Sequence, residues 1–264
     1  GLRSLGYHIM DPAEGWLACG ITGIGRLPEP EAIVDWLESK MCSTNELEGT
    51  TILVTAGGTQ ESIDPVRYIG NRSSGKMGYA IAEQAARMGA KVILVSAPTS
   101  LPIPSGVDFI SVDSAVSMQE AVEARYNDVN VVIMAAAVSD FRVLHKAEQK
   151  IKKMESMTIE LVKNPDILQG LGTKKSHQIL VGFAAETEHV IKYGQDKVAR
   201  KNLDMLVAND VSKSNAGFNV DTNEGYFLYP DKEPKEMPNM KKSDLARHIL
   251  REVIDLVANK ADIN

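Results

Sequence analysis

The chain has 264 residues, 44% of them hydrophobic, and a formal net charge of −6 at pH 7, and it has room for one large domain or for one medium domain with an appendage. The acidic charge argues against a nucleic-acid polymer as the main partner, and we expect no membrane association because no apolar run approaches the length of a bilayer span. Cys19 and Cys42 are too few for a disulfide framework, so we expect a reducing, cytoplasmic setting.

Residues 1–45 differ from the rest of the chain in being rich in glycine and proline. Pro30 suits the first turn of a short helix that continues through Leu37. The polar stretch at residues 43–49 predicts a linker. We therefore expect a small N-terminal segment that leads into the main folded unit.

From Thr51 onward, short apolar runs alternate with stretches of helical periodicity. We expect strands at residues 51–56, 91–97, 107–112, 129–138, 178–183 and 204–208, and helices at residues 77–88, 117–125, 190–201 and 243–258. The run at residues 129–138 is the most apolar, which favours a central strand. This order predicts an α/β fold, a Rossmann-like three-layer sandwich with a mostly parallel sheet.

Two local features complete the predicted fold. Asn164 is an expected N-cap, with Pro165 at the first position of the helix that follows it. Residues 219–221 and 225–229, joined through residues 222–224, predict a β-hairpin insertion.

The turn after the first strand of the sheet contains Gly57 and Gly58. These glycines would let backbone N–H groups approach a phosphate closely, although a Gly-Gly pair by itself favours a plain tight turn. The dinucleotide fingerprint G-x-G-x-x-G is absent, and residues 73–76 (SSGK) lack the preceding glycine of a P-loop. Roughly fifteen polar residues precede the next helix, and compact α/β units rarely carry so long a loop without a use for it.

Other strand ends carry small or polar residues on the same side of the predicted sheet. Asp140 can accept hydrogen bonds from a base or ribose or help to organise a divalent cation, or it can be an ordinary polar strand terminus. Phe183 is followed by small residues that leave room for a base, although it can equally be a core phenylalanine. Asn209 and Asp210 follow the next strand. Because ligands bind beyond the carboxyl ends of parallel strands, these residues predict one binding crevice.

Lysines provide the positive charge that such a crevice needs for a polyphosphate. Lys150, Lys152 and Lys153 follow the central strand, and Lys197 and Lys201 lie one turn apart on a predicted helix. For each group the alternative is a solvated loop or helix face. Their position near the strand ends favours an anion site.

The sequence gives little support to three other chemistries. Tyr193 and Lys197 satisfy the Y-x-x-x-K spacing of short-chain dehydrogenases, but the matching glycine-rich fingerprint is absent. Because of the Tyr193 and Lys197 spacing, a nicotinamide-dependent reductase stays an alternative function. A non-catalytic nucleotide sensor on the same fold is a second alternative. The five histidines form no metal-ligand spacing, and no G-x-S-x-G motif is present.

The chain resembles bacterial phosphopantothenoylcysteine synthetase over roughly residues 50–258. Because several motifs occur in one order, the resemblance is highly specific. It is carried by residues 55–59, 64–67, 71–78, 136–141, 150–153, 163–167 and 182–187. Residues 1–45 resemble the C-terminal end of phosphopantothenoylcysteine decarboxylase, the FMN-dependent domain fused upstream in the bifunctional enzyme. The resemblance thus implies a decarboxylase remnant and linker at 1–45 and a synthetase domain at 46–264.

The resemblance implies a CTP-dependent ligase of coenzyme A biosynthesis, acting as a homodimer. Such an enzyme condenses 4′-phosphopantothenate with L-cysteine through an acyl-cytidylate, and it releases CMP and pyrophosphate. Mg²⁺ would help cations to offset the repulsion between the substrate carboxylate and the phosphates. FMN would belong only to the decarboxylase domain, most of which we expect to be missing from this chain.

The resemblance also assigns roles to individual residues. Lys150 would hold the phosphates during activation, and Asn71 would hold the acyl-cytidylate for its conversion to product. Cys19 matches a decarboxylase proton donor that we expect to be inactive without the flavin domain. The residues expected to bind the nucleotide are Gly57, Gly58, Asp140, Lys150, Asn164, Pro165, Asp166, Ile167, Phe183, Lys197 and Lys201.

Overall fold

The computed structural model describes residues 2–5, 7–16, 20–41, 44–153, 155–186, 188–210 and 222–261. Three features named in the sequence analysis lie outside these described residues: Cys19, Cys42 and the hairpin strand at residues 219–221. Within them, none of the helices combines the length and the apolar character that a membrane span requires.

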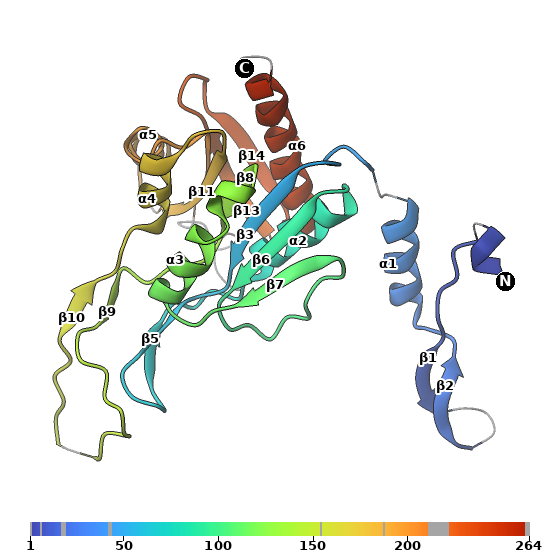
Figure 1. Ribbon diagram of the computed structural model, residues 1–264, viewed down its shortest axis with the longest axis horizontal. Coiled ribbons are helices and arrows are strands. Elements are labelled where there is room, and N and C mark those ends of the chain that lie inside the picture. Colours follow the sequence, from blue (N-terminus) through green and yellow to red (C-terminus); the bar gives the residue numbers. More distant parts are fainter. Residues whose placement is uncertain are drawn as a thin grey trace.

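One eight-stranded sheet organises the main folded unit, in the order β14-β13-β12-β11-β8-β3-β6-β7 (Figure 1). Its strands are β3 (Thr51–Ala56), β6 (Lys91–Ser96), β7 (Val107–Ser111), β8 (Val131–Met134), β11 (Ile179–Glu186), β12 (Met205–Asp210), β13 (Thr222–Leu228) and β14 (Lys235–Lys241). The six strands from β12 to β7 are parallel, whereas β13 and β14 are antiparallel. The predicted Rossmann-like sandwich and the central position of the most apolar strand, β8, are therefore confirmed.

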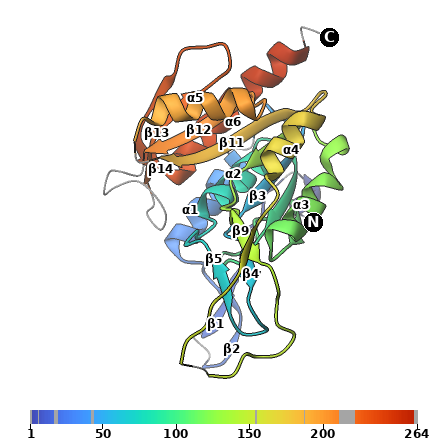
Figure 2. The same ribbon diagram turned by 90° about the vertical axis from the view of Figure 1, so that its left-hand side faces the viewer.

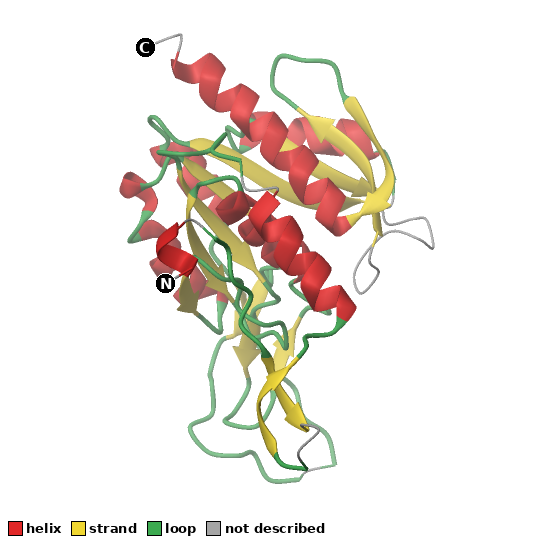
Figure 3. Cartoon of the chain, turned by 90° about the vertical axis from the view of Figure 1, so that its right-hand side faces the viewer, coloured by secondary structure: helices red, strands yellow, loops and turns green. Residues whose placement is uncertain are grey.

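Helices cover both faces of this sheet. They are α2 (Lys76–Arg87), α3 (Ala115–Glu123), α4 (Ile167–Lys174), α5 (Val190–Arg200) and α6 (Lys242–Ala261), with a short 3₁₀ helix η2 (Tyr126–Asp128). Alternate residues of β3 point to opposite faces, so Ile52 packs with α2 and α6 while Leu53 packs with α3, α4 and α5. Figure 3 shows the long α6 crossing its face of the sheet toward the C-terminus.

Two arms project from the end of the sheet where β3 and β8 terminate (Figure 2). One is the hairpin of β4 (Gln60–Ser62) and β5 (Tyr68–Gly70), which occupies part of the long polar stretch before α2. The other is the pair β9 (Phe141–Val143) and β10 (Leu161–Lys163), whose connection carries Lys150. The sequence analysis treated both regions as loops, because each strand has only three residues, which is too few to give a recognisable strand pattern in the sequence.

The N-terminal elements form a separate group beside the sheet (Figure 1). They are η1 (Leu2–Leu5), the antiparallel pair β1 (Ala13–Trp16) and β2 (Thr22–Arg26), and α1 (Pro30–Met41). The short helix predicted from Pro30 is therefore present. The expected linker at residues 43–49 is in part structured, because the Leu47 side chain is only 1% exposed and its N–H donates to Met88 O at 2.9 Å.

The start of α4 differs from the prediction. Asp166 is the N-cap, since its Oδ1 accepts a hydrogen bond from Gln169 N–H at 3.1 Å, and the helix begins at Ile167. Pro165 therefore precedes the helix. Asn164 instead donates from Nδ2 to Ser139 O at 2.8 Å, so a residue expected to cap a helix holds a neighbouring loop.

The antiparallel hairpin also differs from the prediction. Strand β13 includes residues 222–224, which were expected to form the turn, and it pairs with β12 and β14. β14 was missed because an edge strand needs few apolar residues, and Met237 alone in it is fully buried. Pro238 lies in the gap in pairing between Met237 and Met240.

Two glycines in α4 make a matched stability test. A Cβ added to Gly172 would collide with the backbone carbonyl of Lys201, whereas nothing lies within 4 Å of a Cβ added to Gly170. We predict that Gly172→Ala lowers the free energy of unfolding by about 1–3 kcal/mol, and that Gly170→Ala raises it by about 0.5–1 kcal/mol. Urea unfolding of both variants measures the difference. Equal effects would contradict the close packing of α4 against the end of α5.

Candidate functional site

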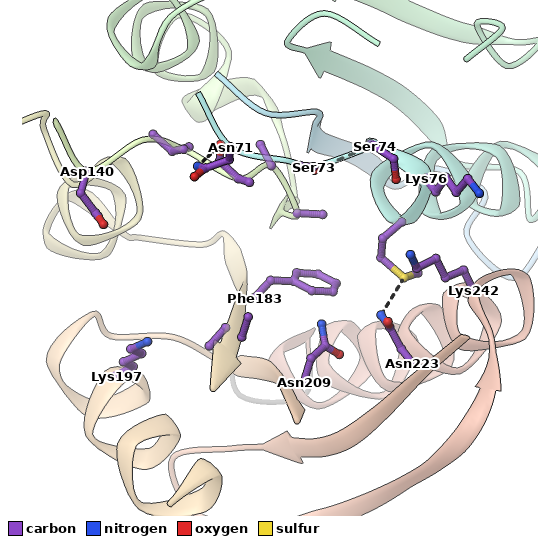
Figure 4. Close-up of a pocket in the computed structure, with 18 residues that line it drawn as sticks. Asn71, Ser73, Ser74, Lys76, Asp140, Phe183, Lys197, Asn209, Asn223 and Lys242 are labelled. Atoms are coloured by element: carbon purple, nitrogen blue, oxygen red, sulfur yellow. Dashed lines mark hydrogen bonds between the residues drawn. The ribbon is translucent and has the colours of Figure 1, made fainter. Parts of the chain in front are cut away.

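A pocket of about 400 Å³ opens at the carboxyl ends of the central strands (Figure 4). Along the parallel part of the sheet, β3 and β8 lie at the point where the strand order reverses direction, and crevices at such points bind ligands in α/β folds. The lining residues are Asn71, Ser73, Ser74, Gly75, Lys76, Met77, Ala135, Ala136, Ala137, Val138, Asp140, Phe183, Ala184, Ala185, Lys197, Asn209, Asn223 and Lys242.

The loop after β8 forms one wall of this pocket, and buried hydroxyl groups hold it. Thr55 Oγ1 accepts from Ala136 N–H at 3.1 Å, and Thr59 Oγ1 accepts from Ser139 N–H at 2.9 Å. Both threonines are fully buried. On the other side, the Asn164 backbone N–H donates to Asp140 O at 2.8 Å. The position of Asp140 is therefore fixed from two directions.

A second wall combines Asn71 with the N-terminus of α2. Asn71 follows β5, and its Nδ2 donates to Ala137 O at 3.1 Å. Gly75 is the N-cap of α2 and has a φ of 77°, and no side chain caps the helix there. A Cβ on Gly75 would approach Thr99 Cγ2 to 2.7 Å, so glycine is required by both conformation and space. Uncapped N–H groups at a helix N-terminus suit an anion.

The third wall comes from the last part of the chain, and the sequence analysis missed most of it. Asn223 on β13 and Lys242 at the start of α6 both line the pocket, beside Asn209 at the end of β12. The Oδ1 atoms of Asn209 and Asn223 are buried and have no hydrogen-bond partner among the described residues. Buried polar atoms are normally satisfied, so these two amide oxygens are available to donor groups of a ligand.

The charges in the pocket lie toward two ends, with Phe183 between them (Figure 4). Lys197 and Asp140 lie at one end, and Lys76 and Lys242 lie at the other. Three lysines and one carboxylate make the lining cationic within a chain whose net charge is −6. The end with Lys76 and Lys242 therefore suits an anionic group, and the end with Lys197 and Asp140 suits a ligand that carries both an anionic group and hydrogen-bond donors.

Lys150 is not brought into this pocket. Its side chain is exposed in the arm between β9 and β10, and it is not among the described lining residues. Its assignment to nucleotide phosphates stays a prediction. Gly57 and Gly58 also lie outside the lining, but both pack beneath it: a Cβ on Gly58 would come within 3.0 Å of Asn71 O.

Residues 164–167 and Lys201 form a support rather than a lining surface. Lys201 Nζ contacts Asp166 Oδ2 at 2.8 Å, which joins the end of α5 to the start of α4. Burial opposes ionisation of the Asp166 carboxyl, but hydrogen bonds from Lys201 and Gln169 lower its pKa overall. Ile167 is buried, at 4% exposure. None of these residues is among the described lining residues, so their nucleotide contacts also stay predictions.

Tyr193 does not support the reductase alternative. It is 44% exposed and packs edge to face against His189, and it does not line the pocket although Lys197 does. A general acid must reach the proton that it transfers, so the pair does not act together in this geometry.

The donor set limits how a metal ion can be held. No group of three or more His, Cys, Asp and Glu side chains among the described residues could hold one. Asp140 is the one carboxylate among the described lining residues. Mg²⁺ commonly binds through one or two carboxylates together with substrate phosphates, and Asp140 fits that arrangement.

Comparison with known proteins gives a consistent result over most of the chain. A family model described as the DNA/pantothenate metabolism flavoprotein C-terminal domain matches residues 47–257. The coenzyme A biosynthesis bifunctional protein CoaBC of Bacillus subtilis (strain 168) is 48% identical over 255 residues. These residues make up 95% of this chain but 63% of that protein, so the chain spans less than two thirds of this relative.

Solved structures show the same similarity. The crystal structure of the C-terminal domain of the bifunctional protein CoaBC matches with a TM-score of 0.72 and 44% identity, over 82% of this chain and 100% of that one. A Cab2 mutant in complex with phosphopantothenate-cysteine matches with a TM-score of 0.62 over 89% of this chain and 96% of that one. At 17% identity, the second likeness concerns the fold alone.

The hydroxyl of Thr59 gives a direct test of how the pocket wall is held. Thr59→Val keeps the shape of the side chain but leaves Ser139 N–H buried without its acceptor, so we predict a loss of about 1–3 kcal/mol in the free energy of unfolding. Thr59→Ser keeps the hydroxyl and should cost less. Urea denaturation compares the two, and a larger loss in the serine variant would show that packing of the methyl group matters more.

Proposed function

Because the chain belongs to the DNA/pantothenate metabolism flavoprotein C-terminal domain family, we propose that it is a CTP-dependent ligase that condenses 4′-phosphopantothenate with L-cysteine in coenzyme A biosynthesis. The observation that carries the proposal is the pocket with lysine side chains at both ends. Two of the substrates carry phosphate, and they must meet with their reacting groups between the two ends. The names of the CoaBC relatives and of the Cab2 complex agree with this reading.

The reaction has two steps that balance without a redox partner. A carboxylate oxygen of 4′-phosphopantothenate attacks the α-phosphorus of CTP, and pyrophosphate leaves to give an acyl-cytidylate. The amine of L-cysteine then attacks the acyl carbon, the amide bond forms, and CMP leaves while the amine loses a proton. Both steps bring groups together in a fixed geometry, which is where a preorganised pocket gains most of its rate.

The first step needs positive charge because a carboxylate approaches a polyphosphate. In this proposal Lys197 lies with the triphosphate, Asp140 contacts the nucleotide, and Phe183 packs against the base. The N-terminus of α2 with Lys76 and Lys242 then takes the 4′-phosphate at the opposite end. Mg²⁺ bound with CTP would further offset phosphate charge, with Asp140 as the available carboxylate.

The second step makes different demands on the same pocket. Asn71 uses one amide N–H on Ala137 O, which orients its side chain and leaves the second N–H and Oδ1 for the acyl-cytidylate or the incoming amine. An amide is too weakly basic to remove a proton, so Asn71 acts by holding the reacting groups. Lys150 is proposed to act in the first step.

We propose that residues 46–264 form the synthetase domain and that residues 1–45 are the end of a flavin-dependent decarboxylase domain. The family match at residues 47–257 supports this boundary. FMN and the proton-donor role of Cys19 would belong to the intact fusion. A homodimer and a cytoplasmic setting complete the proposal.

Pyrophosphate release tests the function directly. With Mg²⁺, CTP and 4′-phosphopantothenate, we expect release, followed by amide formation when L-cysteine is added. Lys197→Gln should slow release by at least about tenfold because a charged contact is lost, whereas Tyr193→Phe should stay within about twofold. CTP binding without release would favour a nucleotide sensor, and cofactor oxidation that depends on Tyr193 would favour a reductase.

Two substitutions separate the half-reactions. Lys150→Gln should suppress formation of the acyl-cytidylate, because a cation that stabilises the developing phosphate charge is removed. Asn71→Asp should let activation proceed but block amide formation, since a carboxylate replaces the amide that holds the intermediate. Quenched-flow detection of acyl-cytidylate distinguishes these results. Equal loss of both steps in both variants would contradict the assigned roles.

A further inference from the structure

An ion pair at the tip of the β4–β5 hairpin, outside the pocket, joins the buried Asp64 carboxylate to the partly exposed Arg67 side chain. The Asp64 side chain has no solvent exposure, and its Oδ2 accepts from Arg67 Nε at 3.0 Å and from Arg67 Nη2 at 2.5 Å. Its Oδ1 accepts from the backbone N–H groups of Val66 and Arg67 at 2.8 and 2.9 Å. Oδ1 therefore accepts from the backbone of the turn, and Oδ2 accepts from the Arg67 side chain.

The same ion pair holds one residue of the neighbouring arm. Ile151 N–H donates to Asp64 Oδ2 at 3.1 Å, and Arg67 Nη2 donates to Ile151 O at 3.0 Å. In an extended chain the N–H and C=O of one residue point to the same side, where a neighbouring strand supplies an acceptor and a donor. Asp64 and Arg67 supply that acceptor and donor with side chains instead of a strand.

This contact matters because of what flanks Ile151. Lys150 and Lys152 are both exposed, whereas Ile151 is half-buried between them. Farther back along the arm, Ala147 N–H donates to Ile63 O at 2.9 Å. The lysines thus belong to a segment whose backbone is held on the hairpin while their charges stay in solvent. Because the lysine side chains are exposed, their ammonium groups stay accessible to a ligand.

The Asp64 carboxylate keeps its charge over the physiological range. Hydrogen bonds from Arg67 lower the pKa of this carboxyl well below its ordinary range, even though burial opposes ionisation. The hairpin that carries Asp64 also ends, through β5, at Asn71 in the pocket wall. One insertion therefore leads into the pocket wall at Asn71 and also contacts the lysine segment at Ile151.

We propose that Asp64 is a positioning residue that fixes the backbone at Ile151 and so limits the positions that the Lys150 ammonium group can reach. The inference rests on the proposed function, in which Lys150 stabilises the nucleotide phosphates. A lysine on a free loop must be ordered at each turnover, and that ordering costs conformational entropy. When the neighbouring backbone is already fixed, only the lysine side chain must be ordered, so the entropy cost is smaller.

The first test is Asp64→Asn in the whole chain, read by hydrogen exchange and by steady-state kinetics. Asparagine can keep the turn through its Oδ1, but its amide group presents donors to Ile151 N–H and Arg67. We expect exchange in the peptide at residues 144–153 to become at least about tenfold faster, and kcat/KM for CTP to fall about tenfold. The KM for L-cysteine should stay within about twofold.

Three further variants separate loss of the contact between Asp64 and Ile151 from a general loss of folding. Ile151→Pro removes the N–H that Asp64 accepts and leaves Asp64 in place, so it should reproduce the loss in kcat/KM for CTP. Gln149→Pro alters an exposed residue of the same arm whose N–H has no hydrogen bond within the described chain, and should have less effect. Glu61→Gln changes another buried carboxylate of the hairpin, one that accepts from Ala115 N–H at 2.9 Å, and should leave the arm unchanged.

A double-mutant cycle decides whether Asp64 acts through Lys150. In a Lys150→Gln background, Asp64→Asn should alter kcat/KM for CTP by less than about twofold. An undiminished effect there, or unchanged exchange at residues 144–153 in Asp64→Asn, would overturn the proposal. If the wild-type chain releases no pyrophosphate, the proposed function fails and the positioning role of Asp64 fails with it, whereas the exchange result still shows whether Asp64 anchors the arm.

Discussion

Backbone hydrogen bonding at the point where β8 leaves the sheet is the constraint on which the candidate site depends. The ladders of β8 with β3 and β11 both end at Met134. Beyond it, a single parallel bridge between Gly58 and Ala137 continues the pairing in the described chain, so other N–H and C=O groups of residues 135–140 need partners from side chains. Thr55, Thr59 and Asn164 provide them with side chains. The loop after β8 therefore leaves the sheet to line the pocket and still has a fixed conformation.

Elsewhere around the pocket, too, residues that line the cavity are held in place by residues behind them. Several residues that face the cavity have a neighbour behind them whose hydrogen bonds or ion pair hold the backbone in place. Asp140 lines the pocket and Asn164 holds its loop; Lys197 lines it and Lys201, one turn later, pairs with Asp166. Such a division lets the lining be polar and incompletely satisfied, as the amide oxygens of Asn209 and Asn223 are, without loss of a defined shape.

The order of strands and helices followed from the sequence because buried parallel strands leave continuous apolar runs and helices leave a stripe. Asp140, Phe183 and Lys197 were found for a related reason, because each follows or faces a predicted strand end, whereas Asn71 was assigned from the family resemblance. Asn223 and Lys242 were not found, since they reach the pocket through antiparallel pairing at the far edge of the sheet, which no local pattern encodes. Capping rules alone could not choose between Asn164 and Asp166, because both residue types cap helices well and only the tertiary contact of Asn164 with Ser139 decides.

Strand β14 has a consequence for how copies of this chain can meet. It is the last strand at its edge of the described sheet, and Pro238 interrupts its pairing while Lys235, Glu236 and Lys241 place charges along it. Proline and charged side chains on an edge strand disfavour the addition of a further strand from another molecule. That border of the sheet is thus protected against open-ended polymerisation, and association between copies is directed to other surfaces of the molecule.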